Sequence, residues 1–344
     1  MNPKFQNALK RIPQATPPIW FMRQAGRYHK HYQALRAKHS FLELCRRPEL
    51  ATEVALGPIE DFDFDVAILF SDILFPLDAL GMGLSYSDQH GPKLATPLTG
   101  ESISNLKTPE EALTELKFQG QALALTRKAL PKNKSLIGFV GGLWTLYVYA
   151  VEGGHSGNLT QAKSQPQLFR NFMEILFPLI QNNIADQLAN GAEVVMVFDT
   201  AAGELSPSCF HSWLEPYLLK LTERFPNKLG YYTKYVGLQY YSTNLKSAPW
   251  AGFGFDHRHE MKDLLAANKS ERTPGFIQGN FDQSLLFLDP NTFQIAMSKY
   301  IERMKSLTLE QRAGWVSGLG HGVLPKTPEQ HVRQFISRIR EEFS

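Results

Sequence analysis

Short apolar runs recur along the chain, and each is followed within a few residues by a glycine, a serine, a threonine or an aspartate. Runs of this length, apolar on both faces and closed by turn residues, are typical of strands buried in a parallel sheet. We count about seven of them, at 66–70, 136–140, 193–198, 229–233, 251–255, 275–278 and 314–317.

Helix signals lie between and after these runs. A capping box places Ser or Thr at the cap and Glu or Gln three residues later, and Ser40 with Glu43 and Thr108 with Glu111 fit it. A similar pattern begins at Ser164. The predicted helices cover 41–45, 109–130, 164–190, 290–304 and the stretch that follows Thr327.

This alternation of strand, loop and helix predicts the α/β class, and seven strand candidates come close to the eight of a (β/α)8 TIM barrel. No Pro/Gly/Ser linker, low-complexity segment or clear repeat divides the chain, so we expect residues 1–344 to form a single domain. Loops that follow the strands of a barrel meet at its carboxyl-terminal face. Asp72, Gly141, Thr200 and the stretch 320–322 should therefore be neighbours.

Composition narrows the functional classes. Of the 344 residues, 43% are hydrophobic and 20% charged, as in globular proteins, and a net charge of +3 is too small to indicate a nucleic-acid surface. Cys45 and Cys209 are the only cysteines and have no zinc-site spacing, which favours a reducing compartment and no metal. The longest apolar stretch, 139–151, is too short for a membrane span, and no secretory signal is present. We expect a cytoplasmic protein with no membrane partner.

The stretch Trp-Phe-Met-Arg-Gln-Ala-Gly-Arg-Tyr at 20–28 is the first candidate for chemistry. It sets Arg23 and Arg27 on either side of Ala25 and Gly26, which leave room for a ligand beside the backbone. Two guanidinium groups at this spacing can clamp a carboxylate. The alternative is a pair of solvated arginines that bind surface carboxylates of the protein itself.

Four other residues are candidates only because of where they stand. Asp72 follows an apolar strand, where it can cap a helix or face a ligand. Tyr149 alone fits core packing, Thr200 alone fits a turn, and His321 between two glycines fits either a structural or a titrating role. The chain has no GxSxG elbow, Walker loop or dinucleotide fingerprint, so we expect no redox cofactor.

Taken in order, these stretches resemble the uroporphyrinogen decarboxylase family over almost the whole chain. The motif Met-Arg-Gln-Ala-Gly-Arg-Tyr at 22–28 is highly specific to that family. The supporting matches lie at 68–74, 144–146, 151–154, 198–200, 278–280 and 319–322, the last followed by Pro325, Thr327 and Pro328. The resemblance implies a single (β/α)8 barrel, a cofactor-free decarboxylase of haem biosynthesis, and a homodimer whose active-site clefts face each other.

The resemblance also implies roles for individual residues. Asp72 matches the central catalytic aspartate. Arg23, Tyr149 and His321 match further catalytic positions. The positions implied to bind the substrate are Arg23, Gln24, Ala25, Gly26, Arg27, Asp72, Tyr149, Thr200 and His321.

The implied reaction converts the four acetate side chains of uroporphyrinogen III into methyl groups and gives coproporphyrinogen III. Loss of carbon dioxide needs an electron sink, which protonation of the adjacent pyrrole carbon supplies. Asp72 should stabilise the resulting cation, while Arg23 and Arg27 orient the carboxylates. The proton donor, the order of the four acetates and the isomer preference stay open.

Several positions depart from the common family pattern. Gly142 and Leu143 stand where Ala-Pro is usual, Gly318 stands for Asn, and His257 stands for Trp. Gln283 and Gly57 are further departures. Two alternatives therefore remain: a non-catalytic tetrapyrrole-binding paralogue, or a zinc-dependent corrinoid methyltransferase of the same superfamily. The second needs a His-x-Cys ligand pattern that this sequence lacks.

Overall fold

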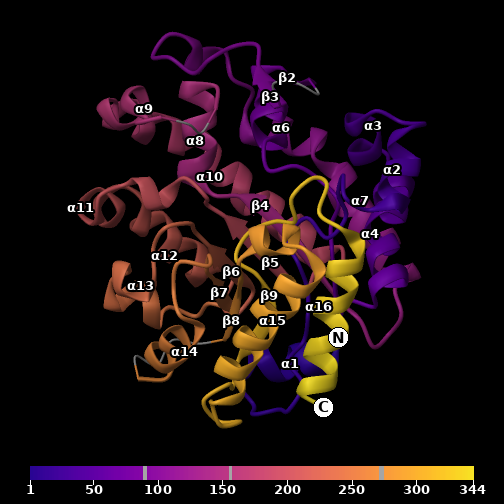
Figure 1. The fold of residues 1–344 in the computed structure, drawn as a ribbon. Coiled ribbons are helices and arrows are strands. Elements are labelled where there is room, and N and C mark those ends of the chain that lie inside the picture. Colours follow the sequence, from indigo (N-terminus) through magenta and orange to yellow (C-terminus); the bar gives the residue numbers. More distant parts are fainter. Residues whose placement is uncertain (88–90, 155–156, 271–274) are drawn as a thin grey trace.

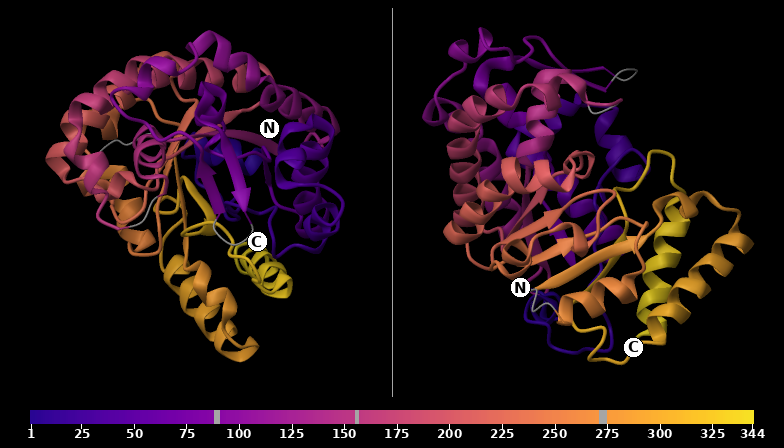
Figure 2. Two further views of the ribbon diagram at one scale, coloured as in Figure 1. Left: turned by 90° about the horizontal axis from the view of Figure 1, so that it is seen from above. Right: turned by 90° about the vertical axis from the view of Figure 1, so that its left-hand side faces the viewer.

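A curled parallel sheet of seven strands forms the centre of the protein in a computed structural model that describes residues 1–87, 91–154, 157–270 and 275–344 (Figures 1 and 2). The strands follow the order β1-β4-β5-β6-β7-β8-β9, so each new strand is added beside the previous one. They are β1 (Val66–Ile68), β4 (Ser135–Gly141), β5 (Val194–Phe198), β6 (Leu229–Tyr232), β7 (Gly252–Gly254), β8 (Phe276–Phe281) and β9 (Trp315–Leu319).

Each apolar run predicted from the sequence overlaps one of these seven strands, although β4, β8 and β9 extend one to three residues beyond their runs, and every pairing in the sheet is parallel. The strands of the sheet are almost entirely buried, which explains why their residues are apolar without alternation. The predicted α/β barrel architecture is therefore confirmed as a curled parallel sheet, although regular strand pairing does not close the sheet into a full barrel.

An extended segment, residues 18–21, lies where an eighth strand would close the barrel. On one side the Ser317 amide donates to the Pro18 carbonyl at 2.9 Å and the Trp20 amide donates to the Ser317 carbonyl at 3.3 Å. On the other side the Asp65 amide donates to the Ile19 carbonyl at 3.0 Å. Proline at position 18 has no N–H to donate, so the segment makes an isolated bridge instead of a regular strand.

Helices surround the outside of the sheet in the order expected of repeated β–loop–α units (Figure 2). The longer ones are α1 (Pro3–Leu9), α2 (Lys30–Arg36), α3 (Phe41–Arg46), α4 (Pro48–Phe62), α6 (Pro109–Glu115), α7 (Lys117–Ala129), α8 (Leu143–Glu152), α10 (Pro166–Ala189), α12 (Glu215–Arg224), α14 (Met261–Ser270), α15 (Pro290–Lys305) and α16 (Glu329–Glu342). The short ones are α5 (Phe75–Leu77), α9 (Thr160–Ser164), α11 (Pro207–Cys209) and α13 (Thr243–Ser247). Six further turns are the π-helices η1 (Asp78–Met82) and η4 (Phe210–Leu214) and the 3-10 helices η2 (Ser102–Asn105), η3 (Ala202–Glu204), η5 (Leu238–Tyr240) and η6 (Gln283–Phe287).

Two of the three predicted capping patterns form as expected. Ser40 accepts a bond from the Glu43 amide at the start of α3, and Thr108 forms a complete capping box at the start of α6. The pattern at Ser164 is wrong, because α10 begins at Pro166 and has no side-chain cap. The Ser164 hydroxyl instead donates to the Gln161 carbonyl at 3.2 Å.

The two ends of the sheet differ in what covers them. Helix α1 covers the amino ends of the strands: the Asn2 amide donates to Ser135 Oγ at 2.8 Å, and the Phe5 ring packs 5.8 Å from that of Phe276. The antiparallel hairpin of β2 (Leu84–Ser87) and β3 (Gly91–Leu94) lies at the opposite end (Figure 1). The loops that follow the strands, where the candidate residues stand, are therefore on the side of this hairpin.

None of the helices that the structure describes is long and apolar enough to span a membrane.

Candidate active site

The arginine loop follows directly from the segment that bridges the sheet. Gln24 is 1% exposed, and its side chain donates to the Val66 carbonyl at 3.1 Å and accepts from the Phe21 amide at 3.3 Å. The Tyr28 hydroxyl donates to the Gln24 carbonyl at 2.7 Å. Gln24, predicted to bind substrate, therefore anchors the loop to β1 through its side chain.

Arg23 and Arg27 are both exposed, while Ala25 and Gly26 between them are half-buried. Within the part of the chain that the structure describes, neither guanidinium forms an ion pair with a protein carboxylate. The Arg23 backbone has φ of 58°, and its side chain lies against Gly322, where an added Cβ would stand 2.6 Å from Cδ. The loop thus presents two charges that no carboxylate among the described residues neutralises.

Asp72 stands in the loop after β1 and is half-buried. Its Oδ1 accepts a bond from the Leu74 amide at 2.8 Å, so the carboxylate does cap a turn, one of the two roles that its position allowed. Burial raises the pKa of Asp72, whereas the Leu74 amide, the Tyr86 hydroxyl and the charge of Arg23 lower it. A carboxylate in this setting is poorly hydrated yet remains close to a cation.

A buried chain of amides holds the loop that carries Asp72. Gln119 of α7 donates to Ser71 Oγ at 2.8 Å and accepts from Asn183 of α10 at 2.9 Å. Gln187 then donates to Asn183 at 3.0 Å and to the Phe139 carbonyl of β4 at 2.9 Å. Although the Gln187 oxygen has no partner within the described residues, this chain of bonds links the residue next to Asp72 to two helices and a strand.

Tyr86 on the hairpin strand β2 is a neighbour of Asp72 that was not among the residues selected from the sequence. Its ring packs 4.7 Å from Phe41, which in turn lies 6.0 Å from Phe70, two residues before Asp72. The hydroxyl is buried and makes no well-formed hydrogen bond within the described residues. Burial raises the pKa of Tyr86, and the nearby charge of Asp72 raises it further. The signal that could have indicated a strand here is the alternation Leu-Ser-Tyr-Ser at 84–87, which puts Leu84 and Tyr86 on one face.

Tyr149 lies near the carboxyl end of α8 and is half-buried. Burial and the charge of Asp72 raise its pKa, and the charge of Arg23 lowers it. The structure therefore brings Tyr149 within electrostatic reach of both residues, as the sequence analysis expected of a shared site.

Thr200 follows β5 on a turn that a buried aspartate fixes. Asp199 Oδ1 accepts from the Thr145 amide at 2.8 Å and from its hydroxyl at 2.7 Å, and that hydroxyl accepts from the Ala201 amide at 3.0 Å. Burial raises the pKa of Asp199 to about 6. Thr200 is half-buried between these two anchored residues, at the carboxyl end of the sheet.

His321 follows β9 and pairs with Tyr232, the last residue of β6. The two rings stack with centroids 6.0 Å apart and planes 6° apart, and the tyrosine oxygen lies 3.2 Å from His321 Nδ1. The Tyr232 hydroxyl also donates to the Gly320 carbonyl at 2.8 Å. Because the Tyr232 hydroxyl donates its only proton to Gly320, its oxygen can only accept from His321. The bond between Tyr232 and His321 therefore forms when Nδ1 of His321 carries a proton.

Arg23 connects these parts of the site, because its charge acts on Asp72, Tyr149 and Tyr232. The candidates from the loops after the arginine segment, β1 and β9 and from α8 thus share one region. Tyr232 was identified from the sequence only as a strand residue, and Tyr86 was not identified at all.

Three of the positions that depart from the common family pattern are glycines packed closely against a neighbouring residue. An added Cβ on Gly142 would stand 2.2 Å from the side chain of Asp199, and one on Gly318 would stand 2.7 Å from the Trp20 carbonyl. Gly57 in α4 packs against His31, whose ring would lie 2.4 Å from an added Cβ. Each glycine is therefore matched to a neighbour that occupies the space of a larger side chain.

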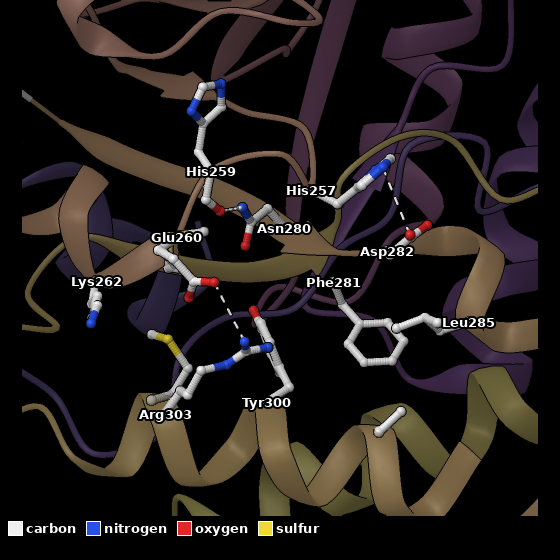
Figure 3. A pocket seen from close by; sticks show the side chains of 13 residues that line it. His257, His259, Glu260, Lys262, Asn280, Phe281, Asp282, Leu285, Tyr300 and Arg303 are labelled. Atoms are coloured by element: carbon white, nitrogen blue, oxygen red, sulfur yellow. Dashed lines mark hydrogen bonds and ion pairs between the residues drawn. The ribbon is translucent and has the colours of Figure 1, made fainter. Parts of the chain in front are cut away.

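His257, a further departure, borders a cavity of about 200 Å³ between the start of α14, the end of β8 and α15. Figure 3 shows His257 directed toward Asp282, at 3.7 Å, and Glu260 toward Arg303, at 3.4 Å. Gln283 begins the short helix η6 beside it. This cavity contains none of the residues predicted for the site.

The described residues contain no group of three or more His, Cys, Asp or Glu side chains placed to hold a metal ion.

Comparison with known proteins identifies the family to which this chain is similar. The family model described as "Uroporphyrinogen decarboxylase (URO-D)" matches residues 1–342. The uroporphyrinogen decarboxylase of Solibacter usitatus is 33% identical over 347 residues, which cover 99% of this chain and 98% of that protein. The one from Ruthia magnifica is 34% identical over 346 residues, which cover 97% of each.

Solved structures agree on the fold. A methyltransferase from Methanosarcina mazei superposes with a TM-score of 0.80 over 99% of this chain and 98% of its own, at 16% identity. A putative vitamin-B12-independent methionine synthase from Listeria monocytogenes superposes with a TM-score of 0.54 at 12% identity. At these identities the likeness concerns the barrel architecture alone.

Proposed function

The chain belongs to the uroporphyrinogen decarboxylase family, and we propose that it is an enzyme that decarboxylates the four acetate arms of uroporphyrinogen III to methyl groups. The product is coproporphyrinogen III, an intermediate of porphyrin and haem biosynthesis. One arrangement supports this assignment more than any other: the half-buried Asp72 carboxylate lies beside Arg23, whose guanidinium makes no ion pair within the described residues.

The chemistry needs charge and positioning more than a cofactor. A proton added to the pyrrole carbon makes the ring cationic, and the electron pair of the C–CO2 bond then flows into that ring as carbon dioxide leaves. A second protonation, at the exocyclic carbon, gives the methyl group, and the ring loses the first proton. Each cycle thus replaces one carboxylate by one proton, with no net oxidation, so no redox cofactor is required.

We assign the central role to Asp72, which stabilises the ring cation and accepts bonds from the inward-facing pyrrole N–H groups. Arg23 and Arg27 hold the carboxylate arms, and the loop residues Gln24, Ala25 and Gly26 shape the surface between them. Gln24 acts by positioning the loop, since its side chain donates a hydrogen bond to the Val66 carbonyl of β1.

The remaining candidates contribute at the edge of the same region. Tyr149 and Thr200 contact the arms of the macrocycle. His321, with Nδ1 directed to Tyr232, supports the carboxylate arms or takes part in proton transfer.

We further propose three properties of the whole protein. Residues 1–344 form one domain, which the continuous strand order and a hydrophobic core running from Phe5 to Phe343 support. The protein is a homodimer with facing clefts, as the family resemblance implies, and sedimentation of the purified protein tests this. It acts in the cytoplasm, which is consistent with the two cysteines remaining free thiols.

The proposal is tested by an anaerobic assay of the purified protein with freshly reduced uroporphyrinogen III, with products separated by carboxylate number after oxidation. The expected product carries four carboxylates. Folded protein that binds the substrate but leaves eight carboxylates would instead assign the chain to a non-catalytic tetrapyrrole-binding role. Zinc analysis of the same sample tests the methyltransferase alternative.

A further inference from the structure

An exposed aromatic ring with two cations over it stands at the carboxyl end of the sheet, outside the arginine loop. Tyr235 follows β6 and is 41% exposed. Lys234 Nζ lies 4.9 Å from the centre of its ring, and Arg258 Cζ, from the loop after β7, lies 4.4 Å from it. Cation–π contacts at these distances hold both charges beside the ring.

A buried carboxylate fixes this cluster in place. Asp256 is 1% exposed and accepts three bonds: from the Tyr235 amide at 2.7 Å, the Arg258 amide at 3.0 Å and Arg258 Nη1 at 2.7 Å. These donors lower its pKa, so it stays charged. They also hold Tyr235 at φ of 72°, a conformation uncommon for a tyrosine.

Asp256 neutralises only part of the positive charge. Its single carboxylate pairs with Arg258, whose side chain remains 43% exposed. Within the residues that the structure describes, Lys234 forms no ion pair. The cluster therefore keeps a net positive charge that faces solvent.

The cluster lies next to the proposed active site. His257, the neighbour of Arg258, packs on the loop of His321: its amide nitrogen would stand 2.5 Å from a Cβ on Gly320. Tyr232, three residues before Tyr235, contacts His321 directly. Burial and the charge of Asp256 raise the pKa of Tyr232, and the charges of Arg23 and Arg258 both act against this rise, so the two guanidinium groups lie near the same side chain.

We propose that Lys234 and Arg258, together with the ring of Tyr235, form a second carboxylate clamp that binds arms of the macrocycle beyond the reach of Arg23 and Arg27. This rests on the proposed function, since the clamp needs a substrate with carboxylates on several edges. Uroporphyrinogen carries eight of them around one ring, and the arms away from the reacting acetate must also be held.

The chemistry of the cluster suits that task. The guanidinium fork binds a carboxylate in a fixed orientation, while the lysine adds a point charge. The exposed tyrosine ring gives the apolar part of a pyrrole arm a surface to pack on. Because Asp256 and the ring already order both cations, less side-chain entropy is lost on binding.

The test compares Lys234→Gln and Arg258→Gln with the matched control Arg303→Gln. Arg303 is an exposed arginine paired with Glu260 at the separate cavity. Each variant is titrated with oxidised uroporphyrin, which has eight carboxylates, by fluorescence, and is assayed anaerobically for kcat and KM. Loss of one charged hydrogen bond predicts a rise in Kd and KM of about tenfold in each clamp variant, with kcat changed by less than about twofold and the control unchanged.

Two further measurements separate a clamp from a structural role. Arg258→Lys keeps the charge and should restore most of the affinity. Lys234→Gln removes no ion pair within the described residues, so its circular dichroism and its sedimentation should match the wild type. A Kd for both clamp variants that equals that of the control, or a loss of kcat at constant KM, would overturn the clamp.

The clamp and the proposed function fail in different ways. Wild-type protein that makes the four-carboxylate product while both clamp variants bind as tightly as it does would leave the decarboxylase standing without the clamp. Wild-type protein that binds uroporphyrin without turnover would remove the decarboxylase, and the Kd values would still decide the clamp. A change in sedimentation of the clamp variants would assign the cluster to a subunit contact and overturn the proposal.

Discussion

At the scale of single residues, Asp72 has the clearest expected effect. Asp72→Asn keeps the shape and the acceptor for the Leu74 amide but removes the negative charge that opposes the ring cation. Loss of such a preorganised electrostatic partner lowers kcat by about 100-fold or more, which the anaerobic assay measures.

The control is Asp289→Asn, at the exposed N-cap of α15, where asparagine is also a good cap. It should keep wild-type kcat. Near-normal turnover of folded Asp72→Asn would contradict the central role given to this carboxylate.

Tyr86 should affect the pH dependence more than the maximal rate. Its hydroxyl lowers the pKa of Asp72, so Tyr86→Phe should raise that pKa. If the ionised carboxylate is the active form, the acidic limb of the kcat/KM profile shifts to higher pH, while the rate well above the limb stays close to wild type.

Tyr32→Phe is the matched comparison for Tyr86. Tyr32 belongs to the same aromatic group, 5.6 Å from Phe70, but it does not act on Asp72. Its profile should match the wild type. Coincident acidic limbs for Tyr86→Phe and Tyr32→Phe would rule out the effect of the Tyr86 hydroxyl on Asp72.

These residues show what a sequence can say about a site. Asp72 could be found because its position after an apolar strand and its motif both pointed to it. Gln24 was found for a related reason, but its side chain is directed into the fold. Alternation at 84–87 could have placed Tyr86 on a strand, but neither Tyr86 nor Tyr232 could be assigned to the site, because only tertiary packing brings the hairpin and the strand end to it.

At the scale of elements, Asp199 joins β5 to α8 and should make their docking depend on pH. Its folded pKa of about 6 lies above the value of about 4 expected in the unfolded chain. The protonated form is therefore favoured in the folded state, and the stability that it adds is fully present below about pH 4 and lost as the pH rises through 6.

Urea unfolding of wild type and Asp199→Asn across this range measures that contribution. The free energy of unfolding of wild type, minus that of the variant, should fall between about pH 4 and 6. Asp289→Asn should show the opposite slope, at lower pH, because capping bonds lower the pKa of Asp289. A difference for Asp199→Asn that stays constant with pH would show that Asp199 titrates normally.

The elements themselves were largely predictable where burial dictates composition. All seven strands of the sheet overlap apolar runs because both faces of the sheet are covered. The capping box at Thr108 formed because its partners are local. The hairpin of β2 and β3 was missed, since each of its strands has only four residues and Gly91 and Pro92 weaken the strand pattern of the second. The pattern at Ser164 failed because Pro166 begins the long helix instead.

At the scale of the whole molecule, the chain ends complete the barrel. The segment 18–21 occupies the gap between β1 and β9. This role could not be predicted from its sequence, because a segment that makes a single bridge does not show the residue pattern of a strand. The Phe21 ring packs 5.2 Å from Phe335 of α16, and the Thr16 hydroxyl donates to the Phe343 carbonyl at 2.6 Å. The first and last elements therefore depend on each other.

This mutual dependence predicts that a substitution near the carboxyl terminus lowers the stability of the whole protein. Phe343 is 4% exposed, its ring lies 5.2 Å from Trp315 of β9, and Arg312 lies over it at 4.7 Å. Phe343→Ala should lower the free energy of unfolding by about 3 kcal/mol or more, while the exposed Phe287→Ala changes it by less than about 0.5 kcal/mol.

The cooperativity of urea unfolding decides whether the whole chain responds to Phe343→Ala. If residues 1–344 are one cooperative unit, far-UV circular dichroism and tryptophan fluorescence should report the same urea midpoint, shifted together in Phe343→Ala. Amides of β1 and α1 should then lose hydrogen-exchange protection along with those of α16, since no part of the sheet keeps its edge covered once the closing contacts weaken. Loss confined to α16, with the midpoint of the remainder unchanged, would mean that the last helix is an independent addition to a core that is stable without it.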